Sequence, residues 1–339
     1  MKWSPRYKLI LQTVITLLVL VFVAIAFWNP LQQLWEHPVD WQEGYLVCAG
    51  LAYLVGISFS MSFWWLSMLS LGQQPVPMRV PWAYFLGHLA KYVPGKALVV
   101  LLRTVLVKGP RCKLEVAATT VVYETVVFMA VGALFAAGVV LIQGPLGERL
   151  NYLHVALLLA GAVPLMIPPV FNAIMHRLTF PLRKLPDGTH APFPRLGIKI
   201  LGLGVLLQSC CSVLMGVSLA LVVIAVRSDI NPWPMLPELV AKLAAATVLG
   251  FVIPTPAGLG TREWAIMVLL QNQIGADYAA LVALLLRITW LISECAMVVF
   301  LLPFRNVGEK SVSADAATSL QIPPLTPPPL PPGEEESKT

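Results

Sequence analysis

Six apolar runs of membrane-spanning length constrain this chain more than any other feature of its sequence. A helix needs about 20 consecutive apolar residues to cross the hydrocarbon core of a bilayer. Only 12% of the 339 residues are charged, whereas soluble domains average about 25%. The sequence therefore predicts an all-α, polytopic integral membrane protein, with full spans at 9–27, 45–71, 115–142, 152–175, 198–226 and 278–303.

The first apolar run has a second interpretation. Its basic flank and the Ala24-x-Ala26 pair also fit a cleaved signal peptide. The run is long for the apolar part of a signal peptide, and we therefore expect an uncleaved first span.

Two further apolar stretches, 82–107 and 236–272, are interrupted in the middle. Their breaks contain Pro94, Gly95, Pro254, Pro256, Gly258 and Gly260. Proline lacks the N–H that continues a helix, and glycine adopts backbone angles closed to other residues. The unpaired backbone at such a break survives within a membrane only against protein or in a wet cavity.

Lys and Arg in the loops predict the orientation of the chain, because basic loops stay on the cytoplasmic side. The loops 108–114 and 176–197 are basic, whereas 28–44 has no Lys or Arg. The sides of the membrane assigned to these loops are mutually consistent only if each interrupted stretch enters the membrane and leaves it on the same side. We therefore expect two re-entrant helical hairpins and both termini in the cytoplasm.

The two halves of the chain resemble each other. Val93-Pro94 aligns with Ile253-Pro254, and in each half an Arg and then a full span follow the break. Similar halves that enter from opposite sides form an inverted-topology repeat, here over about 45–142 and 198–303 of one domain, 1–304. Broken helices at matching positions in such repeats indicate a transport site near the middle of the membrane.

Three ionisable residues lie deep inside the predicted spans. Glu124 lies in the third full span, and Arg287 and Glu294 share one face of the last span. Charged groups at that depth are costly and usually mark function. The alternative is a structural ion pair, such as Glu124–Arg287, that joins the two halves.

The second break also predicts an anion site. A helix that restarts near Thr261 would present free N–H groups, which favour a negative group. Arg262 adds a charge with bidentate geometry for phosphate. We therefore expect a lipid head group to be bound by Arg262, Arg103, Lys96, Gly258, Gly260 and Glu263. The alternative for Arg103, Arg262, Lys91 and Lys96 is that they extend to the membrane surface.

Other chemistry is not predicted. The five cysteines lack the spacing of a metal site, so we expect no metal and no cofactor. The net charge of +6 follows the positive-inside pattern, without an aromatic or basic groove for nucleic acid. The Pro-rich, then acidic segment 305–339 predicts a disordered cytoplasmic tail, which is either inert or a PxxP ligand.

These motifs resemble the lysylphosphatidylglycerol synthase transmembrane family, also called flippase-like domain proteins. The resemblance covers 9–303 and rests on KYVPGK followed by Arg, a Glu-bearing span, PAGLGTREW and an Arg-bearing last span. It implies an inner-membrane fold with two re-entrant hairpins and a role in moving or presenting lipids between leaflets. The family often has Glu-Arg and then Asp in the third span, where this chain has Glu124-Thr125 and Phe128. The aminoacyl-transferase domain of the bifunctional synthases is also absent.

We expect a protein of the cell (inner) membrane that is not an enzyme and that translocates an anionic lipid. The lipid could be a phospholipid, an aminoacyl-phospholipid or a lipid-linked sugar. Two alternatives remain open. The chain could be an accessory partner of a separate lipid synthase or glycosyltransferase, or a membrane transferase that uses Glu124, Glu263 or Glu294 as acid or base. The sequence does not predict the oligomeric state.

Overall fold

The structure of the protein is a computed structural model, described for residues 42–92, 97–109, 111–143, 152–185, 188–252 and 260–304. These ranges contain α-helices and short 3-10 helices and no named β-strand. The predicted first span 9–27, the predicted tail 305–339 and the two breaks, apart from Gly260, lie outside them.

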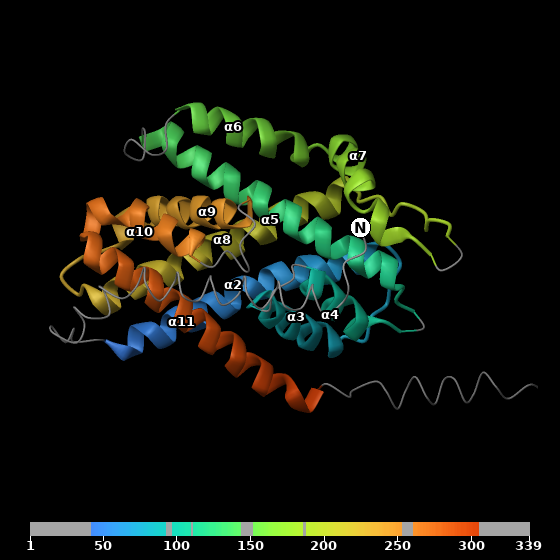
Figure 1. Ribbon diagram of the computed structural model, residues 1–339, viewed down its shortest axis with the longest axis horizontal. Helices are drawn as coiled ribbons and strands as arrows, with labels where there is room; N and C mark the ends of the chain where they lie inside the picture. The colour runs from blue at the N-terminus through green and yellow to red at the C-terminus, as the bar shows by residue number, and fades with distance from the viewer. Residues whose placement is uncertain are drawn as a thin grey trace, which may run out of the picture.

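The described helices form one bundle (Figure 1). Before its central connection the chain forms α2 (Glu43–Ser70), α3 (Arg79–Leu89), η1 (Ala90–Tyr92), α4 (Ala97–Val107) and α5 (Leu114–Gln143). The connection consists of α6 (Tyr152–Ala162), η3 (Val163–Met166), α7 (Pro168–Leu178) and η4 (Phe180–Arg183). The chain then forms α8 (Ile198–Val226), η5 (Trp233–Met235), α9 (Leu236–Val252), α10 (Thr261–Ile274), α11 (Ala276–Leu301) and η7 (Leu302–Phe304).

Five of these segments are long and apolar enough to cross a membrane: α2, Leu114–Leu141 of α5, α8, Trp233–Val252 and α11. Many large apolar side chains on their outer faces are exposed, as on lipid-facing helices. The prediction of a polytopic, all-α membrane protein is therefore confirmed.

Glycines allow the two central helices to pack closely. α2 and α8 run in opposite directions, because Gln42 at the start of α2 bonds to Ala225 at the end of α8. A Cβ on Gly204 of α8 would lie 2.3 Å from the ring of Phe63 on α2, and one on Gly56 of α2 would lie 3.3 Å from the Cys211 carbonyl. Small residues at such contacts are typical of membrane helices, which associate mainly by close packing.

Each interrupted stretch folds as a hairpin whose two ends meet. At the first, Gln74 N–H donates to the Arg111 carbonyl and Lys113 N–H donates to the Gln73 side chain, at 2.8 and 2.7 Å. α3 and α4 have 11 residues each. Such a helix is about 16 Å long, which is too short for a hydrocarbon core of about 30 Å.

The second hairpin, η5 to α10, opens at the other end of the bundle. Arg227, which precedes it, donates to the carbonyl of Ile274 at its end, 3.2 Å away. This contact lies at the start of α2, whereas the first hairpin opens at the end of α2. The order helix, hairpin, helix therefore occurs twice in opposite directions. One difference from 82–107 is that Trp233–Val252 by itself is long enough to span a membrane.

One predicted span is bent rather than a single straight helix. The sequence predicted a full span over 152–175, whereas in the structure α6 and α7 are separated by η3 and meet at an angle of 95°. Ile167 is extended between them, with ψ 113°, as expected of a residue before proline. Pro164 and Pro168 flank this bend and interrupt the hydrogen-bond ladder of a continuous helix.

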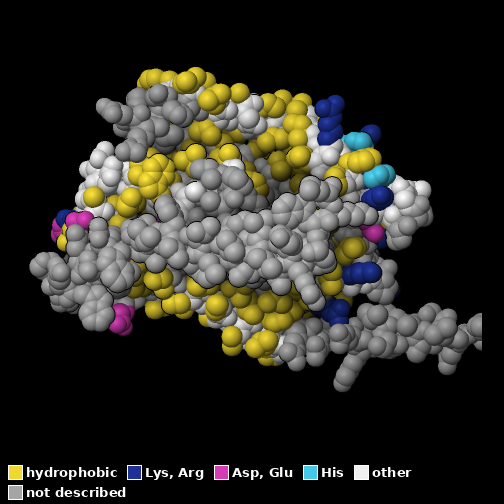
Figure 2. All heavy atoms as spheres, viewed as in Figure 1, with side chains coloured by type: hydrophobic (Ala, Val, Ile, Leu, Met, Phe, Trp, Pro, Cys, Tyr) yellow, Lys and Arg dark blue, Asp and Glu magenta, His cyan; other side chains and the backbone are white. Residues whose placement is uncertain are grey.

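The ends of the bundle differ in charge. The basic end, where α2 finishes, carries the exposed side chains of Lys108, Arg111, Lys113, Arg177, Lys184, Arg195 and Lys199. The acidic end, where α2 begins, carries Glu43, Asp229 and Asp277 exposed beside Arg227. Figure 2 shows Lys, Arg and His side chains gathered at one end of the molecule.

The hairpin geometry predicts which positions share a side of the membrane. In a background without the exposed Cys48 and Cys295, we expect Gln74→Cys and Arg111→Cys to react with an impermeant thiol reagent from one side only. Asn231→Cys and Asn272→Cys should react only from the opposite side, because they flank the second hairpin. Labelling of positions 74 and 111 from opposite sides would show that 82–107 crosses the membrane.

Candidate functional site

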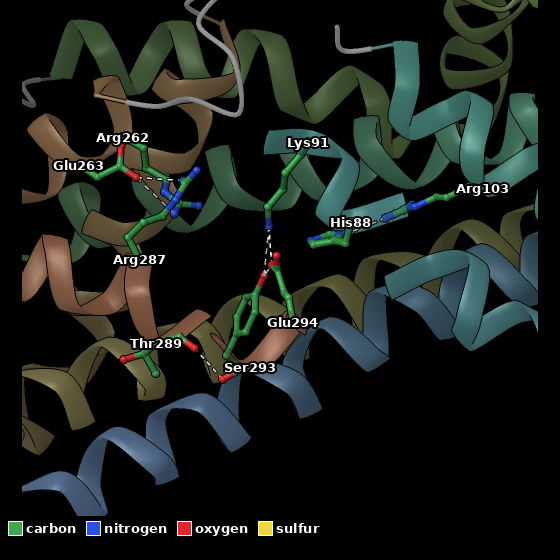
Figure 3. Close-up of polar contacts among 10 residues, drawn as sticks. His88, Lys91, Arg103, Arg262, Glu263, Arg287, Thr289, Ser293 and Glu294 are labelled. Carbon is green, nitrogen blue, oxygen red and sulfur yellow. Dashed lines mark hydrogen bonds and ion pairs between the residues drawn. The ribbon is translucent and has the colours of Figure 1, made fainter. Parts of the chain in front are cut away.

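Three groups of charged side chains lie in a row through the middle of the bundle (Figure 3). The outer two groups fasten each hairpin to the helix that follows it, and the central group joins the first hairpin to α11. We call them the first hairpin cluster, the bridging cluster and the second hairpin cluster.

In the first hairpin cluster, Arg103 of α4 binds Glu124 of α5. Arg103 Nη1 lies 2.5 Å from Glu124 Oε2, and the guanidinium lies 4.0 Å from the ring centroid of Tyr84. Arg103 Nη2 lies 2.9 Å from His88 Nδ1. Because arginine has no acceptor, this ring nitrogen must accept the hydrogen bond.

Neutral side chains complete the environment of Glu124. Its Oε1 accepts hydrogen bonds from Ser60 of α2 and Tyr84 of α3, at 2.7 and 2.8 Å. Ser60 in turn accepts a bond from Gln208 of α8, at 3.0 Å. Both oxygens of this buried carboxylate are therefore engaged, which compensates for its removal from water.

In the bridging cluster, Lys91 of η1 binds Glu294 of α11. Lys91 Nζ lies 2.5 Å from Glu294 Oε1, which also accepts a hydrogen bond from the hydroxyl of Tyr53. The side chain of Lys91 is 21% exposed, whereas that of Glu294 is fully buried. Tyr53 stacks on Trp290, with ring centroids 4.3 Å apart.

The second hairpin cluster lies at the start of α10. Glu263 Oε1 lies 3.0 Å from Arg287 Nη1 of α11 and 3.7 Å from Arg262 Nη2. Glu263 Oε2 accepts the N–H of Gly260, 2.9 Å away, and so caps the helix. Gly260 has φ 81°, a conformation that favours glycine. The predicted restart of the helix near Thr261 is therefore confirmed.

Arg262 is the cation without a carboxylate of its own. It shares Glu263 with Arg287, and its guanidinium lies 4.8 Å from the ring centroid of Trp290. Its Nε has no hydrogen-bond partner within the described part of the chain. Across the three clusters, four described cations face three carboxylates, which leaves one positive charge.

The two hairpin clusters have the same layout with opposite signs. When Pro94 is aligned with Pro254, residue 103 falls on residue 263. The first hairpin contributes arginine and the following helix glutamate, whereas the second contributes Glu263 and the following helix Arg287.

The suggested ion pair Glu124–Arg287 is wrong, because each of these residues pairs with the hairpin of its own half. Arg103, predicted to bind a head group, is buried against Glu124 and lies apart from Arg262 (Figure 3). Six predicted site residues lie outside the described residues: Pro94, Gly95, Lys96, Pro254, Pro256 and Gly258.

Sequence reasoning missed the hydroxyl groups that α2 contributes. Tyr53, Ser60 and Ser67 are seven residues apart and are all buried. Seven residues make almost two helical turns, so this spacing indicates one polar face. The described residues contain no group of three or more His, Cys, Asp or Glu that could hold a metal ion.

The pairing in the first hairpin cluster predicts a specific pattern of stability. Glu124→Gln should destabilise the protein by about 3–5 kcal/mol, because it leaves Arg103 as a buried charge without its partner. Adding Arg103→Met should cost much less than the sum of the two single effects. The matched control, Glu124→Gln with Arg287→Met, should lose close to the sum, since these residues belong to different pairs. Thermal unfolding in detergent measures each variant. Additive losses for 103 and 124 would contradict the pairing.

The comparisons with known proteins agree with this architecture. A family model described as the lysylphosphatidylglycerol synthase TM region matches residues 9–293. The matched range includes both hairpin clusters and Lys91, and it ends one residue before Glu294. Neither a curated protein nor a solved structure shows a significant match. Because the family model covers most of the chain, this multi-pass membrane protein belongs to the lysylphosphatidylglycerol synthase TM-region family, whose description ties it to lipid handling.

Proposed function

We propose that the protein binds the anionic head group of a lipid between Lys91 and Arg262 and moves that lipid between leaflets. We call these two described residues, one beside each break, the hairpin tips. The observation that supports this most directly is the positive charge at Arg262. Its nearest carboxylate, Glu263, is also bound by Arg287. The Nε of this guanidinium is buried and has no hydrogen-bond partner among the described residues. A phosphate that enters between the clusters could accept hydrogen bonds from this Nε and from one terminal nitrogen together, a geometry that lysine lacks.

Lys91 would supply the second positive group. It is partly exposed, and it belongs to the tip of the other hairpin. An arriving phosphate would compete with Glu294 for this ammonium group. A negative ligand would therefore change the contact that joins the first hairpin to α11, and binding would affect how the two halves are held together.

If the two hairpins are re-entrant, a lipid head group can reach the proposed site from either leaflet. The hairpins open at opposite ends of the bundle, and Lys91 and Arg262, which lie beside the two breaks, are both drawn among the buried charges of Figure 3. α10 has 14 residues and is about 21 Å long, so the second hairpin also has an arm shorter than the hydrocarbon core. A head group at the tips would then be separated from each membrane surface by one hairpin.

The proposed ligand class is a lipid with a phosphate, such as a phospholipid, an aminoacyl-phospholipid or a lipid-linked sugar. We propose movement without covalent change, since each of the three carboxylates is held by at least one cation. Carboxylates in such pairs are better suited to positioning cations than to transferring protons. We also propose that the basic end faces the cytoplasm of the cell membrane, following the positive-inside rule.

Substitution of Arg262 tests the head-group site. In proteoliposomes, tail-labelled fluorescent phosphatidylglycerol in the inner leaflet should become accessible to external dithionite when the protein is present. Arg262→Gln should slow this exchange by about tenfold to hundredfold, the range expected for loss of charge-assisted hydrogen bonds. Arg262→Lys should be intermediate, because it keeps the charge and loses the planar fork.

Two controls separate charge from shape. Asn272→Asp changes the net charge as much as Arg262→Gln does, at an exposed position of the acidic end, and should exchange at the native rate. Gly260→Val should lower both the exchange rate and the melting temperature, because a β-branched residue is strained at φ 81°. The proposal is wrong if Arg262→Gln exchanges lipid at the native rate, or if the native protein exchanges no faster than empty vesicles.

A further inference from the structure

α7 and η4 form an element that the sequence did not predict. α6 packs beside α5, which is a membrane-spanning helix, and α7 turns away from α6 by 95°. Because α6 packs along the spanning helix α5, we infer from this angle that α7 lies close to the plane of the membrane. The turn brings α7 to the basic end of the bundle, where it lies at the edge in Figure 1.

Some apolar side chains of α7 are buried against the rest of the protein, and others are exposed. Phe171 and Met175 are buried in a cluster with Phe63 and Tyr123. Ile174 and Leu178, which are four residues apart and share a face, are 37% and 54% exposed. In η4, Phe180 and Leu182 extend this exposed apolar surface.

The element is held in place by hydrogen bonds and ring contacts with the segment that follows it. The buried Arg183 donates to the carbonyls of Ala191 and His176, at 2.8 and 3.3 Å, and its guanidinium lies near the rings of Phe180 and Phe193. Asn172 exchanges two hydrogen bonds with the backbone of Leu196, both 3.0 Å long. The exposed apolar side chains therefore belong to an ordered surface.

Positive charge surrounds this surface. Arg177 and Lys184 lie on the element itself or directly after it, and both are exposed. Five other exposed Lys and Arg side chains share the basic end, where the described residues include one carboxylate, the half-buried Glu115. Figure 2 shows the same concentration of Lys, Arg and His.

We propose that α7 and η4 dock in the plane of the leaflet at the basic end and recruit anionic phospholipids there. Ile174, Leu178, Phe180 and Leu182 insert among the acyl chains, while Arg177 and Lys184 bind the phosphates. Apolar side chains beside basic ones on an in-plane helix are the features by which such helices bind anionic membranes. This lipid contact is separate from the head-group site between the hairpin tips and does not depend on transport.

A fluorophore on one introduced cysteine tests the depth of the element. In nanodiscs and a background without Cys48, Cys210 and Cys295, the native cysteines that are not buried, a probe at Leu178→Cys should be quenched by acyl-chain nitroxide lipids and protected from aqueous iodide. A probe at Ala173→Cys, which is exposed on another face of α7, should show the opposite pattern. Equal iodide quenching at both positions would overturn the in-plane docking.

The preference for anionic lipid has its own readout at the same probe. Nitroxide-labelled phosphatidylglycerol should quench the probe at 178 more strongly than labelled phosphatidylcholine does. Arg177→Gln with Lys184→Gln should weaken that preference by about fivefold for each removed charge. Gln42→Glu with Asn272→Glu changes the net charge equally at the acidic end and should leave the preference unchanged. An unchanged preference in the 177/184 variant would overturn the recruitment of anionic lipid.

Discussion

A buried ion pair between each hairpin and the helix that follows it is the interaction on which the rest of the structure depends. A charge inside the bundle is unfavourable unless an opposite charge and hydrogen bonds accompany it. Arg103 therefore positions α4 against Glu124, and Glu263 positions α10 against Arg287. In the first half the hairpin carries the arginine, and in the second half it carries the glutamate. The two halves can still have the same geometry, because the attraction is the same whichever helix carries the positive charge.

Fixing both hairpins in this way positions the residues beside the two breaks, and the proposed head-group site uses one residue from each. Lys91 and Arg262 come from opposite halves, and their side chains are 21% and 12% exposed, against 4–9% in the pairs behind them. Glu124, Arg103, Glu263 and Arg287 hold the hairpins, while Lys91 and Arg262 are the cations that we propose a ligand uses.

The bundle also meets its lipid surroundings asymmetrically. The connection between the halves, which the sequence suggested was a simple span and loop, bends by 95° before α7. We propose that α7 and η4 lie in the plane of the leaflet at the basic end. The bend at Ile167 separates the part that follows the bundle axis from the part that crosses it. An apolar count over 152–175 does not reveal this change of direction, because α6 and the buried face of α7 are both apolar.

The sequence by itself determined that the protein lies in a membrane and that its fold is all-α. It also determined the long spans and the two interrupted stretches, because these features depend on local composition and on Pro and Gly. The sequence also placed Glu124, Arg287 and Glu294 deep in the spans, where charges are costly, and Glu263 beside the second break. Only the tertiary structure decided the pairings: Arg103 rather than Arg287 for Glu124, and Lys91 for Glu294. Partners in a bundle come from different helices, and their contact depends on helix rotation and depth, which the spacing along one helix does not specify.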